Sequence, residues 1–134
     1  MARQYSTAVR NAQGDAWESA IGPSAILRIW TGAIPPSAAA PDTGNTKLGE
    51  FQLASDWSAA ASGGVKALNN LPLVGPSIGS GIASYYRFMD STGTTCHEQG
   101  TVAMAGGDMT IDNTSVVAPQ PLQVTAYSKT YPGA

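Results

Sequence analysis

Residues 82–102, IASYYRFMDSTGTTCHEQGTV, decide how this sequence folds. Two runs rich in aromatic or β-branched residues flank the tetrapeptide Asp90-Ser91-Thr92-Gly93, and residues of those types favour strands. A polar tetrapeptide that ends in glycine is typical of a hairpin turn, because glycine tolerates a positive φ angle. We therefore predict strands at residues 82–90 and 94–102 that pair as antiparallel neighbours.

Short apolar stretches separated by Gly, Pro, Asn, Asp and Ser continue on both sides of this hairpin. The strands expected from this pattern span residues 25–31, 46–53, 109–112 and 122–131. The segments that lack a period are expected to be loops and span residues 32–45, 55–64 and 69–81. Short strands punctuated by turns are typical of a sandwich or a small barrel. We predict a mostly β fold with two antiparallel sheets packed face to face.

Only one segment has a helical period. The pattern predicts a helix over residues 6–20, which Ser6 or Thr7 caps and which Gly22-Pro23 ends. We expect its mostly alanine face to lie against a sheet or a neighbouring subunit. That face consists of Tyr5, Ala8, Val9, Ala12, Ala16, Ala20 and Ile21.

The length of 134 residues is near the modal size of one domain, so we expect a single domain over 1–134. Within it, residues 1–22 would form the N-terminal helix and arm, and residues 23–134 the β-sandwich. Ala, Gly, Ser and Thr account for 61 of the residues, whereas Ile, Leu, Val and Phe account for only 23. A net charge of −2 is too small to indicate disorder, so we expect a thin core that gains buried area by assembly.

Charge and hydropathy exclude two kinds of partner. Seven scattered Lys and Arg residues and a pI near 5.1 offer no basic stripe, so nucleic-acid binding is not expected. No apolar run approaches the ~20 residues that cross a bilayer, and the N-terminal stretch MARQYSTAVRNAQGDAW lacks the apolar centre of a signal peptide. We expect a protein made in the cytoplasm that has no membrane partner.

The cluster Cys96-His97-Glu98 brings a thiol, an imidazole and a carboxylate into adjacent positions. Neighbouring side chains on a strand point to opposite faces, so His97 cannot take a proton from Cys96. We expect Cys96 to face the core and His97 to face outward. One cysteine and one histidine also exclude an internal disulfide and the usual structural zinc ligands. We predict that the chain is not an enzyme and that it holds no metal and no cofactor.

Four carboxylates leave one enzymatic alternative open. Asp108 and Asp112 flank residues 109–111, and if these are extended the two Cα atoms lie about 13 Å apart, which is too far to share one ion. We expect them to close turns instead. A carbohydrate-active sandwich would need paired acids that face one cleft. The acids available for it are Asp90, Glu98, Asp108 and Asp112.

Aromatic residues and the Pro-rich segment 32–45 are the best candidates for contacts with a partner, since aromatic residues often anchor interfaces. Trp57 lies in the small-residue stretch ASDWSAAASGG, so it either folds back over the edge of the sandwich or docks on a partner. We expect segment 32–45 and the loop around Trp57 to be mobile in the free protein and ordered on the partner. The candidate interface residues are Trp57, Trp17, Ile34, Pro35 and Pro36.

Several short motifs follow one another in a recognisable order. They are AVRNA at 8–12, LRIWTG at 27–32, LGEF at 48–51, YYRF at 85–88, GTV at 100–102 and DMTIDNT at 108–114. Their order, together with the small-residue composition, resembles the small virion proteins of tailed bacteriophages, and among them the jelly-roll cement or head-decoration proteins. The resemblance covers most of the chain and implies a jelly-roll-like fold at the capsid surface of the virion.

The resemblance also implies two partners and a structural role. A cement protein bridges subunits of the major capsid protein and needs no catalyst, and closed symmetry favours a homodimer on a twofold axis. The alternative is a tail- or fibre-associated β module that binds a host-surface ligand, because such a module would also be rich in strands and loops. Copy number separates the two, since hundreds of copies per particle indicate capsid cement and a few indicate the tail.

Overall fold

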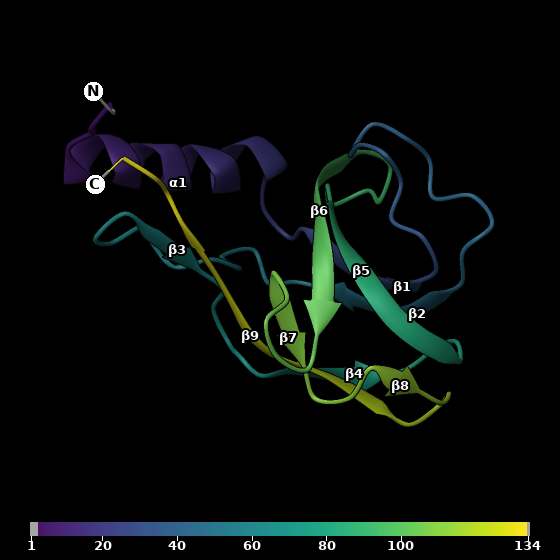
Figure 1. The fold of residues 1–134 in the computed structure, drawn as a ribbon. Helices are drawn as coiled ribbons and strands as arrows, with labels where there is room; N and C mark the ends of the chain where they lie inside the picture. The colour runs from purple at the N-terminus through teal and green to yellow at the C-terminus, as the bar shows by residue number, and fades with distance from the viewer. Residues whose placement is uncertain (1–2, 134) are drawn as a thin grey trace.

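One helix and nine strands account for the regular structure of residues 3–133, which a computed structural model describes (Figure 1). The helix α1 spans Thr7–Ile21. Within these residues no helix has the length and apolar character needed to cross a membrane. The strands are β1 (Ile26–Thr31), β2 (Lys47–Gln52), β3 (Val65–Ala67), β4 (Leu73–Pro76), β5 (Gly81–Met89), β6 (Cys96–Ala103), β7 (Met109–Ile111), β8 (Ser115–Val116) and β9 (Pro121–Thr130).

The strands join into one curled, mixed sheet. Hydrogen-bonded neighbours follow the order β2-β1-β5-β6-β7-β9-β3, with β4 also paired to β9 and β8 to β5. β6 and β7 run parallel, and the other pairs are antiparallel. In Figure 1 the curl brings the end with β9 and β4 round to the end with β1 and β2. The predicted mostly β fold with one helix is confirmed, whereas the two separate sheets of a sandwich are not.

The parallel pair β6–β7 joins the two halves of the sheet, and two glycines allow it. Residues 104–108 alone connect these strands, so the chain must reverse twice within a short loop. Gly106 has a φ angle of 79°, which favours glycine, and a Cβ at Gly107 would lie 2.9 Å from the backbone nitrogen of Ala103. Alternation along a strand does not report which strands pair, so the sequence pattern alone does not predict this link.

The predicted hairpin is confirmed. β5 and β6 pair antiparallel, and Gly93 in the turn has a φ angle of 72°. The Asp90 carboxylate closes the turn, because its Oδ1 accepts hydrogen bonds from Thr92 Oγ1 at 2.8 Å and from the Thr94 N–H at 3.0 Å. The Thr94 N–H bond, with the Thr92 hydroxyl second, lowers the pKa of Asp90.

Three short strands are not predicted by the sequence pattern: β3, β4 and β8. β4 lies within segment 69–81, which we expected to be a loop because it lacks a period. The register Val74↔Gln123 and Gly75↔Leu122 nevertheless pairs it with β9. Proline is tolerated there because β4 has β9 on one side only in the strand order of residues 3–133.

The helix is confirmed, but it presents the opposite face to the protein. Ser6 Oγ accepts a hydrogen bond from the Val9 N–H at 3.2 Å at its start, and Gly22 ends it with a φ angle of 91°. Of the predicted apolar face only Ile21 is buried; its alanines and Val9 face solvent. The buried face carries Gly14 instead, where a Cβ would lie 3.1 Å from the Ala61 Cβ. A stripe of alanines has too little apolar area to outweigh specific polar contacts.

Those polar contacts centre on Lys66 of β3, which is fully buried and faces the helix. Its Nζ donates hydrogen bonds to Asp15 Oδ1 at 2.9 Å and to Glu18 Oε1 at 2.6 Å, both on α1. Burial acts to lower the pKa of Lys66, but the hydrogen bonds and charges of Glu18 and Asp15 outweigh it and raise that pKa. A buried cation must be paired, so the acidic side of the helix turns inward.

An aromatic cluster fills the core between the helix and the sheet. The Trp57 ring centroid lies 5.0 Å from that of Trp17 and 5.5 Å from that of Phe88, and Trp17 also stacks on Tyr127. Trp57 is 2% exposed, and its indole N–H donates to the Gly22 carbonyl at 2.9 Å. Trp57 therefore lies in the core and not on a docking loop, whereas Trp17 is half-buried against the same cluster and its place in a partner interface stays a prediction. Of the two interpretations of Trp57, folding back over the sheet is the one confirmed.

Candidate functional site

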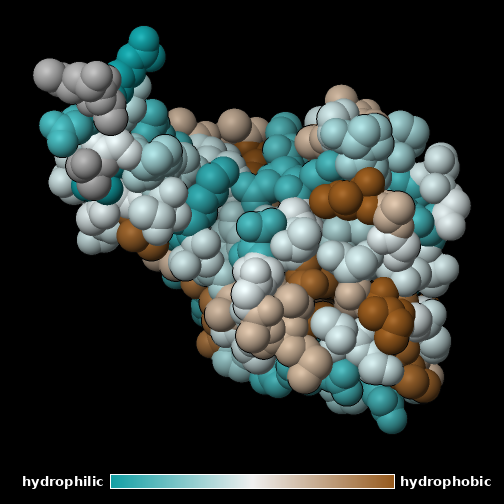
Figure 2. Space-filling model, in the orientation of Figure 1, coloured by the Kyte–Doolittle hydropathy of each residue, from teal (hydrophilic) through white to brown (hydrophobic). Residues whose placement is uncertain are grey.

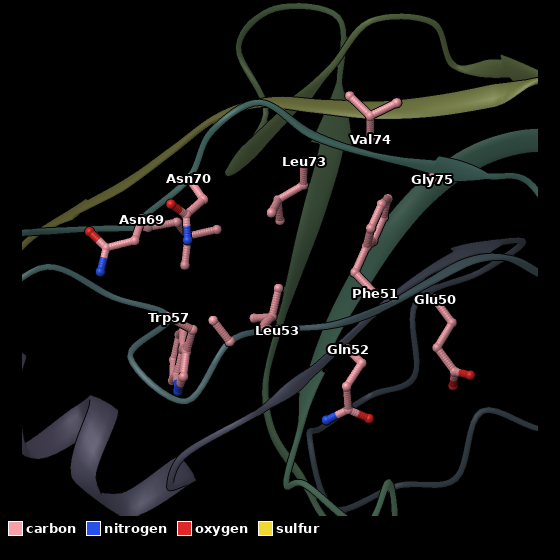
Figure 3. Close-up of a pocket in the computed structure, with 12 residues that line it drawn as sticks. Glu50, Phe51, Gln52, Leu53, Trp57, Asn69, Asn70, Leu73, Val74 and Gly75 are labelled. Carbon is pink, nitrogen blue, oxygen red and sulfur yellow. The ribbon is translucent and has the colours of Figure 1, made fainter.

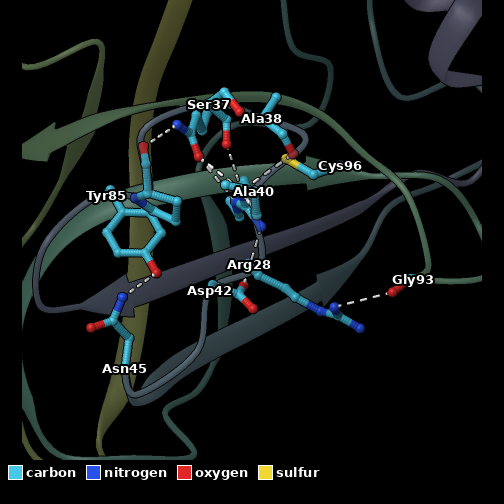
Figure 4. Close-up of polar contacts among 12 residues, drawn as sticks. Arg28, Ser37, Ala38, Ala40, Asp42, Asn45, Tyr85, Gly93 and Cys96 are labelled. Carbon is cyan, nitrogen blue, oxygen red and sulfur yellow. Dashed lines mark hydrogen bonds and ion pairs between the residues drawn. The ribbon is translucent and has the colours of Figure 1, made fainter.

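The segment 32–45, hereafter the arm, forms a loop without regular structure that crosses over β5 and β6 (Figure 4). Arg87 of β5 lies beneath it and is only 3% exposed. Its Nη2 donates to the carbonyls of Ala40 at 2.6 Å, Ser37 at 3.2 Å and Ala38 at 3.3 Å. Its Nη1 lies 3.6 Å from Asp42 Oδ2. One buried guanidinium thus satisfies the carbonyls of a loop that has no strand partner.

Two amide side chains secure the ends of the arm. Gln99 of β6 accepts from Arg87 Nε at 3.1 Å and donates its Nε2 to the Pro35 carbonyl at 2.7 Å. Asn45 donates its Nδ2 to the Ala33 carbonyl at 3.0 Å and to Tyr85 Oη at 2.9 Å. Contacts within the chain therefore hold the arm against the sheet, and the expected mobility of the arm in the free protein stays a prediction.

The arm presents apolar side chains at its outer surface. Ile34 is 43% exposed and Pro36 is exposed, whereas Pro35 is buried against the sheet. The structure therefore brings two of the five predicted interface residues to the surface, on one loop. Sequence reasoning missed Arg87, the residue that holds them. The signal was an arginine within the otherwise aromatic run YYRF.

A cleft of about 690 Å³ lies beside the arm and contains Cys96. Cys96 is half-buried there rather than in the core, and burial raises the pKa of its thiol. The expectation that Cys96 faces the core is wrong in this respect, since the arm and not the core covers it. His97 is exposed, as predicted.

Glu98 of β6 is the most heavily hydrogen-bonded carboxylate among residues 3–133. It accepts from Tyr86 Oη and Tyr127 Oη, both at 2.6 Å, from Trp17 Nε1 at 3.0 Å and from Lys129 Nζ at 3.3 Å. Burial, with the charge of Glu98 second, raises the pKa of both tyrosines well above the ordinary value. This carboxylate connects the helix to three strands, and nothing in the sequence pattern distinguishes it from the other acids.

Of the four acids considered for an enzyme, Glu98 and Asp108 line one pocket of about 400 Å³. Asp108 Oδ2 accepts from the backbone N–H of Thr101 at 3.0 Å and from its hydroxyl at 3.1 Å, which is the predicted turn-closing role. Asp112 Oδ1 accepts from the Gln123 N–H at 3.2 Å, also as a structural contact. Within residues 3–133 no three His, Cys, Asp or Glu side chains are grouped so that they could hold a metal ion.

A third cavity, of about 300 Å³, lies between β2 and β4 (Figure 3). Leu53 and Leu73 enter it from opposite sides, Trp57 lies at one end, and Phe51 reaches across towards Gly75. We call it the seam cavity, because it lies where the two ends of the curled sheet meet. Asn69 and Asn70 add polar groups to its rim.

Exposed apolar side chains also gather near β8. Val117 and Ile78 lie close together, because Ser77 Oγ donates to the Val117 carbonyl at 3.2 Å, and Ile82 is opposite Ser115 in the β5–β8 pair. Figure 2 shows hydrophobic surface over the end of the molecule where β4 and β8 lie in Figure 1.

Comparisons of this chain with protein families, curated proteins and solved structures found no match.

Proposed function

We propose that this protein is a structural virion protein that decorates and cements the capsid shell of a tailed bacteriophage by bridging subunits of the major capsid protein. The resemblance in motif order and composition supports this role. The observation that carries it is the arm, which holds exposed Ile34 and Pro36 on a loop fixed by buried Arg87. A loop with an apolar tip, held against the sheet, suits a docking surface.

Preorganisation gives the arm an advantage in binding. Ordering a mobile segment costs roughly 1–2 kcal/mol per residue, which an interface must offset. Because the carbonyls of the arm already have donors in Arg87, Gln99 and Asn45, little of this cost falls on docking. In this proposal the curled sheet acts as the scaffold, and its two facing ends correspond to the layers of a jelly-roll sandwich.

Assembly on a shell also fits the surface of the molecule. The apolar side chains near β8 form a second exposed area, separate from Ile34 in the sequence. A bridging protein needs two contact areas, and we propose that one serves the shell and the other a second copy on a twofold axis. Repetition over a shell strengthens contacts that are weak individually.

The test is to mix the protein with undecorated capsids and count bound copies. Ile34→Asp is expected to lower the affinity about tenfold or more, since a buried interface anchor costs at least ~1.4 kcal/mol. Val9→Asp is the matched control, because Val9 is equally exposed but lies on the helix, away from the arm. The arm would be excluded as the docking surface if both variants lost binding equally, or if neither variant lost binding.

Copy number in the intact particle then tests the location. Hundreds of copies on the shell are expected for a cement protein. A few copies at the tail would support the alternative, a β module that binds a host-surface ligand. An image of the particle with the protein tagged distinguishes the two directly.

A further inference from the structure

The seam cavity lies between two strand edges that have no partner strand within residues 3–133. β2 is one end of the strand order and pairs only with β1, and β4 pairs only with β9. The two edges meet at one point, where the Ile78 N–H donates to the Leu48 carbonyl at 2.8 Å. Beyond that point the seam opens into the cavity.

The backbone groups along both edges point into the seam. The Leu53 N–H donates to the carbonyl of Ala25, the residue just before β1, so Leu53 points its backbone groups towards β1. Because these directions alternate along an antiparallel strand, the N–H and C=O of Gln52 and of Glu50 point away from β1. In β9, the Gln123 N–H donates to Asp112 Oδ1 and the Gln123 carbonyl accepts from the Asp112 N–H. Both backbone groups of Gln123 therefore point towards the β7 side.

Val74 stands opposite Gln123 in the β4–β9 register, so its own N–H and C=O point away from β9, towards the seam. Val74 is also 59% exposed, and within residues 3–133 no strand pairs with this edge. The edge of β3 differs, because α1 packs over that strand and its cation.

We propose that the seam binds an extended peptide segment as an added strand, with one bulky apolar side chain in the seam cavity. On the β2 edge, the unpaired N–H and C=O groups of Glu50 and Gln52 lie two residues apart and match the backbone of a strand. On the β4 edge, Val74 alone offers an N–H, because Pro72 and Pro76 have none. The cavity is at the lower end of the roughly 300–1,000 Å³ of small-molecule sites, which suits a single side chain.

Charge complementarity selects an uncharged segment. The one ionisable side chain in the lining is Glu50, and its Oε1 already pairs with Arg28 Nε at 2.6 Å and Lys47 Nζ at 3.2 Å. The rest of the lining is apolar or amide. An acidic or basic side chain in the cavity would lose its hydration without gaining a partner.

Peptide binding at the seam is independent of the proposed function, since the test needs no capsid. We would titrate the ¹⁵N-labelled protein with a capped heptapeptide of alternating Thr and Leu, and with the same peptide carrying Asp in place of Leu. The Leu peptide is expected to shift the amide signals of Glu50, Gln52 and Val74 and the indole signal of Trp57, in a saturable way. The Asp peptide is expected to shift none of them.

Three variants separate strand addition from plain hydrophobic contact. Val74→Pro removes the edge N–H but not a β9 bond, and it is expected to weaken binding about tenfold, whereas Val74→Thr keeps the N–H and should bind as wild type does. Ala54→Trp, at an exposed lining position, should block the cavity. The spectrum of each free variant checks that it is folded.

Several results would overturn the proposal. One is the absence of seam shifts at millimolar peptide, and another is equal binding by the folded Val74→Pro and Val74→Thr variants. Binding by Ala54→Trp would also contradict it. Seam shifts that depend on protein concentration without peptide would assign the edge to a second copy of the chain instead.

Discussion

Trp57→Ala is expected to destabilise the protein strongly, because the ring lies in the core and not on a docking loop. Removing a buried tryptophan costs roughly 3–5 kcal/mol, and the Gly22 carbonyl would also lose its hydrogen-bond donor, about 1 kcal/mol more. Domains have about 5–15 kcal/mol in total. Unfolding entropy of about 2.1 cal/mol/K per residue gives about 0.28 kcal/mol/K for 134 residues, so 4 kcal/mol lowers Tm by about 14 °C.

A circular-dichroism melt measures this shift, and near-ultraviolet signals report the aromatic cluster. Ile34→Ala is the control, because an exposed side chain contributes within about 0.5 kcal/mol and should move Tm by less than about 2 °C. A Trp57→Ala melt within about 4 °C of wild type would refute the core assignment. Near-ultraviolet signals that persist unchanged would refute the coupling of Trp57 to Trp17 and Phe88.

The other predictions concern the arm, the dependence of stability on pH, and the thiol of Cys96. Arg87→Met is expected to expose the arm to limited proteolysis and to cost about 3–5 kcal/mol if the carbonyls it binds stay buried; unchanged cleavage would contradict its role. Turn hydrogen bonds lower the pKa of Asp90, so the stability that its carboxylate contributes is complete above the ordinary pKa of 3.8 and is lost as pH falls through the lower pKa of the folded state. The Asp90→Asn variant should therefore show a weaker dependence of Tm on pH in that acid range. The pKa of Lys66 is raised by Glu18 and Asp15 against the effect of burial, so its contribution is complete below 10.5 and is lost as pH rises further, which a melt in alkaline buffer detects. Cys96→Ser is expected to leave capsid binding unchanged and to cost no more than ~1 kcal/mol, as an urea titration would show.

The hairpin and the long strands were predictable because their signals are local. Alternation and aromatic content locate β5, β6 and β9, and a polar turn that ends in Gly93 fixes the antiparallel pair. The short strands β3, β4 and β8 contain two to four residues each, which leaves little alternation to detect, and among the short strands only β7, of three residues, was predicted. Their positions depend on pairing with β9 and β5, a tertiary effect.

The orientation of the helix could not be read from its apolar period. Alanine and valine at three- and four-residue spacing predict a buried stripe, but that stripe faces solvent. The decisive contact is Lys66, which lies 51 residues after Asp15 in the sequence and requires two carboxylates once it is buried. Long-range electrostatic pairing therefore overrides local periodicity when the apolar residues involved are small.

The core has few large apolar side chains, so buried charged side chains that connect one element to another contribute more of its stability. We call these side chains connectors. Lys66 connects β3 to the helix, Glu98 connects β6 to the helix, β5 and β9, and Arg87 connects β5 to the arm. Loss of one partner from such a group costs about 3–5 kcal/mol, a large part of the stability of a domain. We therefore expect the loss of any one of these three side chains to destabilise the arrangement of the elements it connects.

The three connectors differ in what could replace them. Lys66 and Glu98 bind side chains, so a matched set of apolar residues could in principle restore stability at either place. Arg87 binds the carbonyls of Ser37 and Ala40, and no substitution in the arm removes a backbone carbonyl. An apolar residue at 87 would leave them without a donor, so the loop would have to move into solvent. The position of the exposed Ile34 therefore depends on Arg87, one buried side chain of β5. In docking, the arm and the sheet would move together as one unit.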